Sequence, residues 1–101
     1  MNCYELKPTN GRKSFYGKAA VELLNGKKLL RSYNTEVALI DENGTFHRLW
    51  SGYSATTMNH VNSFLDSEGI DGGGKKWWNA QPVERFDWIA FYIGKPTKAA
   101  C

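Results

Sequence analysis

The stretch "KSFYGKAAVELLNGKKLLRSYNTEVALI", residues 13–40, decides the fold class because it reads as two strands joined by a tight turn. Alternate residues of its first half are apolar, which indicates a strand with one buried face. The dipeptide Asn25–Gly26 then supplies the residues preferred in two-residue hairpin turns, since both positions need a positive φ. We therefore predict one strand over residues 13–24 and a returning strand over residues 27–40.

A second turn follows with the same Asn-Gly chemistry. It is "DENG" at residues 41–44, and "TFHRLW" at residues 45–50 is predicted to be the third strand. Residues 1–12 carry proline, asparagine and glycine and little periodicity, so we expect a loose or edge segment there. The middle of the chain is thus predicted to be a three-stranded antiparallel meander.

The period of the apolar residues then changes from two to 3.6 in "SGYSATTMNHVNSFLDSEG", residues 51–69. Ser54 is the predicted N-cap and Gly69 the predicted left-handed terminator of this helix. The residues recurring three and four positions apart form one apolar stripe: Met58, Val61, Phe64 and Leu65. This stripe is expected to pack on the sheet.

The last third of the chain begins with a glycine-rich connector at residues 67–76, followed by "KKWWNAQ", which suits one or two helical turns. "RFDWIAFYIG", residues 85–94, is apolar on both faces and is predicted to be a C-terminal strand. The expected fold is α+β: a single domain over residues 1–101, in which the meander and the C-terminal strand pack against one main helix.

The composition is typical of a small globular binding domain. The chain has 101 residues, 42% hydrophobic and 14% aromatic, which is a large aromatic share for one modest core. Some of these rings are therefore expected at the surface, where they often mark contact sites. The formal charge of +3 permits an anionic partner without requiring one.

The two cysteines, Cys3 and Cys101, lie near opposite ends of the chain. Their pairing stays open, but the N-terminus lacks the apolar region of a signal peptide, which favours free thiols and a cytoplasmic location. Two isolated cysteines and two isolated histidines match no zinc pattern, so neither a metal nor a cofactor is predicted. No apolar run reaches the length of a membrane span.

A near match to a phosphate-binding loop runs from Gly69 to Lys75 as G-x-x-x-x-G-K. Lys76 stands where that motif needs serine or threonine for magnesium, and the predicted main helix precedes the glycines instead of following them. The helix would therefore present its negative end to a phosphate. Nucleotide binding is not predicted for this loop.

The leading site hypothesis is a contact surface for a protein partner. It combines lysines with flat aromatic rings, and its predicted members are Lys75, Lys76, Trp77, Trp78, Trp50 and Tyr53. Adjacent tryptophans cannot both face the same way in a helix or a strand. We therefore expect one of Trp77 and Trp78 in the core and the other exposed or half-exposed.

Two alternatives stay open. The first is direct nucleic-acid binding by a basic sheet face made of Arg12, Lys13, Lys18, Lys27, Lys28, Arg31 and Arg48. The second is an enzyme, which would need a cleft around His60, Tyr53 and a threonine. His60 is more simply expected to bind a carbonyl or a hydroxyl beside the apolar stripe, and no catalytic residue is predicted.

Three phrases resemble a group of small uncharacterised proteins from bacterial genomes, phages and mobile elements: "KSFYGKA" (13–19), "SYNTEVA" (32–38) and "LWSGYSATTMNHVNSFL" (49–65). The resemblance implies no established activity. It does imply a setting, the cytoplasm of a bacterial host, in which a non-enzymatic effector docks on a host defence or nucleic-acid enzyme as an inhibitor does. A homodimer formed through strand edges is left open.

Overall fold

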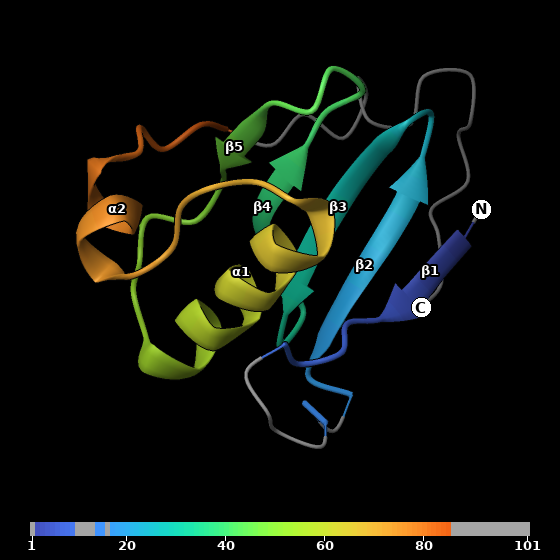
Figure 1. Ribbon diagram of the computed structural model, residues 1–101, viewed down its shortest axis with the longest axis horizontal. Helices are drawn as coiled ribbons and strands as arrows, with labels where there is room; N and C mark the ends of the chain where they lie inside the picture. The colour runs from blue at the N-terminus through green and yellow to red at the C-terminus, as the bar shows by residue number, and fades with distance from the viewer. Residues whose placement is uncertain (1, 10–13, 16, 86–101) are drawn as a thin grey trace.

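The fold is a five-stranded antiparallel sheet with two helices, seen in a computed structural model that describes residues 2–9, 14–15 and 17–85 (Figure 1). The strands follow one another in the order of the sequence: β1 (Asn2–Glu5), β2 (Ala19–Leu24), β3 (Lys27–Ser32), β4 (Thr35–Ile40) and β5 (Phe46–Arg48). The helices are α1 (Ala55–Glu68) and α2 (Lys75–Ala80). The α+β class is confirmed, but the sheet has more strands than the predicted meander. Of the predicted C-terminal strand, residues 86–94 lie outside the described part of the chain.

The hairpin at Asn25–Gly26 is confirmed. Both residues have positive φ, 54° and 79°, as a tight two-residue turn requires. The first strand begins later than predicted, at Ala19, because the backbone turns just before it. There Gly17 has a φ of 76° and the amide of Lys18 donates to the carbonyl of Phe15 at 3.1 Å.

The single returning strand predicted over residues 27–40 is wrong. The chain turns again at Tyr33–Asn34, which separates β3 from β4. Tyr33 and Asn34 have φ angles of 53° and 74°, so they form a second two-residue turn without any glycine. A tyrosine rarely adopts this conformation, so the only local turn signal was the weak one of Asn34.

The N-terminal segment forms an edge of the sheet. β1 pairs antiparallel with β2, and the buried Leu6 continues the contact by donating its amide to the carbonyl of Ala19 at 2.9 Å. Of the two expectations for residues 1–12, a loose or an edge segment, the second holds for Asn2–Glu5.

Helix α1 is bounded as predicted. Ser54 Oγ accepts from the amide of Thr57 at 3.0 Å, and Gly69 ends the helix with a φ of 69°. The predicted stripe is buried and packs with Val21 and Leu30 in the main core. Figure 1 shows α1 lying across one face of the sheet and α2 beyond it, on the side of β4 and β5.

The opposite face of the sheet is also apolar. Leu24, Leu29, Leu39 and Leu49 form a second, smaller cluster. The register pairs Glu22 with Leu29, and Leu29 with Leu39, so these side chains share the face turned away from α1.

The state of the cysteines and the absence of a membrane span were also predicted. Cys3 is disulfide-bonded, so the expected free thiol at this position is wrong; Cys101 lies outside the described residues. Within residues 2–9, 14–15 and 17–85, neither helix has the length and apolar character to cross a membrane.

Candidate docking surface at the second helix

Arg48 fastens the loop after β5 to α2. It is buried on the helix face of the sheet, because its register partner Ala38 pairs in turn with the core residue Leu30. Its Nε donates to the carbonyl of Trp50 at 2.8 Å, and its Nη1 donates to the carbonyl of Trp78 at 2.9 Å. Further carbonyl acceptors are those of Ser51, Gly52 and Gln81. One guanidinium therefore holds residues 50–52 against α2.

The two tryptophans of α2 divide as predicted. Trp78 is fully buried, with its Nε1 donating to the carbonyl of Gly52 at 2.8 Å and the Arg48 guanidinium 4.4 Å from its ring. Trp77 is half-buried, with its ring 5.0 Å from that of Phe46. Trp78 therefore has no surface to offer a partner, and its inclusion among the contact residues is corrected.

The glycine-rich connector is a shaped bend. Gly72, Gly73 and Gly74 have φ angles of 143°, 106° and 87°, which side-chain-bearing residues rarely adopt. A Cβ at Gly72 would lie 2.5 Å from the Trp77 ring, and one at Gly73 would lie 2.6 Å from Asn62 Oδ1. Asn62 Oδ1 also accepts from the amide of Gly74 at 3.1 Å. This bend fixes where α2 begins.

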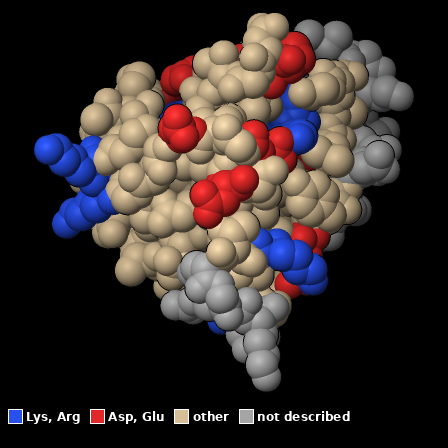
Figure 2. All heavy atoms as spheres, in the orientation of Figure 1, with Lys and Arg blue, Asp and Glu red and all other residues tan. Residues whose placement is uncertain are grey.

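An exposed basic and aromatic corner results. Lys75 and Lys76 are exposed at the start of α2, and Lys75 Nζ lies 5.2 Å from the ring of Tyr53, which is 40% exposed. Trp50 is half-buried and packs against the main core, and its carbonyl accepts from Arg48 Nε. Figure 2 shows basic side chains projecting at the edge of the molecule that α2 forms. We call Trp50, Tyr53, Lys75, Lys76 and Trp77 the docking surface.

Among the described residues, the basic side chains expected for nucleic acid do not gather on one face of the sheet. Adjacent residues of a strand point to opposite faces, so Lys27 and Lys28 separate, and the buried Arg48 is unavailable. Lys27 binds Glu42 at 2.7 Å, Lys28 binds Glu68, and Arg31 binds Glu22 and Glu36. Lys18 is exposed, while Arg12 and Lys13 lie outside the described residues.

His60 makes the expected bond to a hydroxyl. It is buried between α1 and β3, where its Nδ1 lies 2.8 Å from Ser32 Oγ, and Ser32 Oγ lies 3.1 Å from Thr57 Oγ1. The ring of Phe15 packs edge-on against it at 4.5 Å. Thr57, one of the threonines open to the enzyme hypothesis, joins His60 through Ser32, whereas the ring of Tyr53 contacts Lys75.

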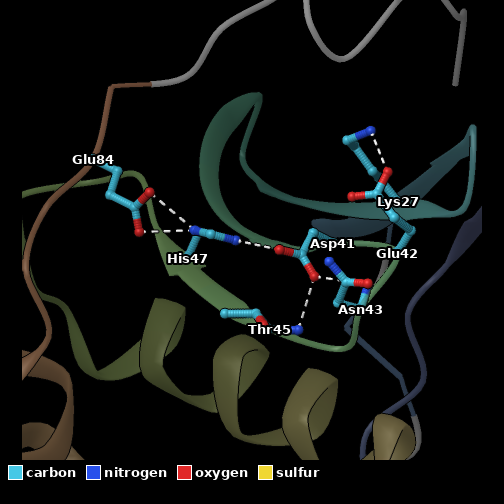
Figure 3. Close-up of polar contacts among 7 residues, drawn as sticks. All are labelled: Lys27, Asp41, Glu42, Asn43, Thr45, His47 and Glu84. Atoms are coloured by element: carbon cyan, nitrogen blue, oxygen red, sulfur yellow. Dashed lines mark hydrogen bonds and ion pairs between the residues drawn. The ribbon is translucent and has the colours of Figure 1, made fainter.

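A histidine between two carboxylates was missed by sequence reasoning (Figure 3). His47 Nε2 lies 2.8 Å from Asp41 Oδ2, and His47 Nδ1 lies 2.9 Å from Glu84. Asp41 Oδ1 also accepts from the amides of Asn43 and Thr45, both at 2.9 Å. No local spacing could reveal this cluster, because Glu84 follows α2 and reaches β5 only in the folded chain.

The electrostatics of this cluster favour a charged histidine. Partial burial opposes the imidazolium, but the bonds to Asp41 and Glu84 outweigh it and raise the pKa of His47 above its ordinary value. The bond from His47 and the amides of Thr45 and Asn43 lower the pKa of Asp41. With both ring nitrogens occupied, His47 ties the β4–β5 turn to the segment after α2. The described residues contain no group of histidines, cysteines and carboxylates suited to a metal ion.

A family model matches residues 4–80, from within β1 to the last residue of α2. The chain belongs to DUF8033, a family of unknown function. No curated protein and no solved structure matches it. The DUF8033 match contains Arg48 and the docking surface, whereas Gln81 of the Arg48 clamp and Glu84 of the His47 cluster both follow residue 80.

Proposed function

We propose that this DUF8033 chain is a non-catalytic binding protein that docks on a protein partner through its docking surface. The observation that carries the proposal is a contrast among the lysines. Lys27 and Lys28 each hold a carboxylate, whereas Lys75 and Lys76 have no ion-pair partner among the residues that the structure describes. Positive charge is thus left for another molecule beside the exposed ring of Tyr53.

The rigid support of this surface favours binding. Arg48 fixes the loop that carries Trp50, and the glycine bend fixes the start of α2. Aromatic anchors held in place before binding lose little conformational freedom on association, which strengthens an interface of moderate size.

The resemblance to small proteins of phages and mobile elements supports the kind of partner. Proteins of this size in that setting commonly act on host machinery. We therefore favour a host enzyme of defence or nucleic-acid metabolism as the target, with inhibition by occlusion as the mode of action.

Direct nucleic-acid binding, the alternative function, would have to use the docking surface as well. Lysines beside flat rings also suit single strands, which stack on aromatic side chains. Salt separates the two ideas, because two lysines on phosphates would make affinity fall about tenfold between 50 and 200 mM salt. An interface anchored by aromatic burial should change much less.

Affinity capture from bacterial extract tests the proposal, in arms with and without nuclease. The wild-type chain should retain the same protein in both arms, and the triple variant Tyr53→Ala, Lys75→Ala, Lys76→Ala should lose it. Lys27→Ala is the matched control, since this lysine points away from the docking surface and binds Glu42. Retention only without nuclease would favour nucleic acid, and retention by the triple variant would reject this surface.

A further inference from the structure

Tyr33 holds a conformation that its side chain disfavours. The side-chain-bearing residues with positive φ in the described part of the chain are Asn25, Tyr33 and Asn34. Asparagine tolerates this region through local hydrogen bonds, but a bulky aromatic residue there is an outlier. The β3–β4 turn is therefore strained at Tyr33, whose φ is 53°.

The turn itself does not require a tyrosine. The β2–β3 hairpin solves the same geometric problem with Asn25–Gly26, the residues best suited to two successive positive φ angles. Two hairpins of one sheet can thus be compared directly. The one without glycine carries an avoidable strain.

Burial of the ring does not explain the strain either. Tyr33 is 51% exposed, the largest exposure among the exposed large hydrophobic residues described. Its ring lies 5.9 Å from that of His60, in a tilted arrangement, and Lys18 Nζ lies 5.7 Å from its centroid. Strain that packing does not repay is characteristic of sites of function.

Tyr33 and Lys18 repeat the chemistry of the docking surface. In each pair the ammonium group of a lysine lies over the ring of an exposed tyrosine: Lys18 over Tyr33, and Lys75 over Tyr53. The two pairs flank the start of α1: Tyr53 directly precedes the cap Ser54, and Tyr33 contacts His60 in the second turn. The first turn of α1 between them has no acidic residue.

We infer that Tyr33 and Lys18 are a second contact point for the protein partner, and that the partner presents an acidic segment to both tyrosine–lysine pairs. This inference rests on the proposed function and adds the chemistry of the partner. Neither Lys18 nor Lys75 has an ion pair among the described residues. The carboxylate of Glu5 near Lys18 is already bonded, since it accepts from the Gly17 amide and the Ser14 hydroxyl. Two free ammonium groups beside an uncharged helix start complement carboxylates.

The test measures stability and binding for the same variants, with an oligoglutamate peptide as probe and an oligothymidylate in a parallel arm. Tyr33→Asn should raise the Tm by about 4 °C because it relieves the strain. It should also weaken oligoglutamate binding by about threefold, the loss expected for one cation–π contact. Tyr33→Phe keeps the ring and should match the wild type in both measurements.

Several results would overturn the inference. A lower Tm for Tyr33→Asn would make the ring a packing residue, and unchanged oligoglutamate binding would remove Tyr33 from the contact. Binding of oligothymidylate alone would assign the corner to nucleic acid. If Tyr33→Asn binds the protein that the triple variant loses with the affinity of the wild type, the proposed function stands and this inference falls.

Discussion

Arg48 binds Trp78 in two ways at once: its Nη1 donates to the Trp78 carbonyl at 2.9 Å, and its guanidinium lies 4.4 Å from the indole ring. The arginine comes from the edge of the sheet and the tryptophan from a helix 30 residues later. The position of α2 therefore depends on a buried charge that is satisfied by backbone carbonyls.

Replacing Arg48 by methionine should destabilise the chain by about 3 kcal/mol, because several carbonyls lose a charged donor. Urea unfolding followed by tryptophan fluorescence measures the change. Lys76→Ala, on the exposed side of α2, is the control and should stay within about 0.5 kcal/mol of the wild type. A loss below about 1 kcal/mol for Arg48→Met would show that the clamp does not hold α2.

The two tryptophans of α2 should respond differently to truncation. Trp78→Ala removes a fully buried ring and should cost about 3–5 kcal/mol. Trp77→Ala removes a half-buried ring and should cost about 2 kcal/mol while weakening capture of the partner. Thermal unfolding gives the first comparison. Equal losses for both variants would place Trp77 in the core and take it out of the docking surface.

The glycines should form a graded series. Gly69→Ala meets no atom within 4 Å and should cost about 1 kcal/mol for its positive φ alone. Gly72→Ala adds a contact of 2.5 Å with the rigid Trp77 ring, so its loss should exceed about 2 kcal/mol and change the near-UV circular dichroism. Similar losses at both positions would mean that the bend moves freely away from Trp77.

His47 makes stability depend on pH in a defined direction. Its pKa is raised in the folded state, so its contribution is complete below the unfolded value of about 6.5 and is lost as pH rises through the folded value. Asp41 affects stability at acidic pH. Its pKa is lowered in the folded state, so its contribution is complete above the unfolded pKa of about 3.9 and is lost as pH falls through the lower pKa of the folded state.

Urea unfolding across pH, compared between the wild type and His47→Gln, checks this expectation. The wild type should lose stability relative to the variant on the alkaline side of pH 6.5, since the neutral ring can donate only one hydrogen bond. NMR titration of the ring gives its pKa directly. A pKa at or below the ordinary value would contradict the arrangement with Asp41 and Glu84.

Local signals predicted the parts of the fold that local chemistry determines. The turn at Asn25–Gly26, the cap at Ser54 and the terminator at Gly69 each act over a few residues, and each lies where the sequence indicated. The division between Trp77 and Trp78 followed from geometry for the same reason.

The errors arose where distant segments decide the outcome. The turn at Tyr33 opposes the intrinsic preference of its residue, so only the completed sheet and the contacts of β3 with α1 can maintain it. Arg48 was grouped with the basic residues of the sheet, but it is buried, and its carbonyl acceptors come from residues 50–52, from α2 and from Gln81. The partners of His47 are likewise separated in the sequence.

The strictly sequential strand order has a kinetic consequence. From β2 to β5 every pairing joins neighbouring segments across a short turn, so contact order is low and little loop-closure entropy opposes each step. The link from Arg48 to Trp78 spans 30 residues and has to wait until α1 has docked. We therefore expect the docking surface to assemble last, so that only chains that have finished folding could bind the proposed partner.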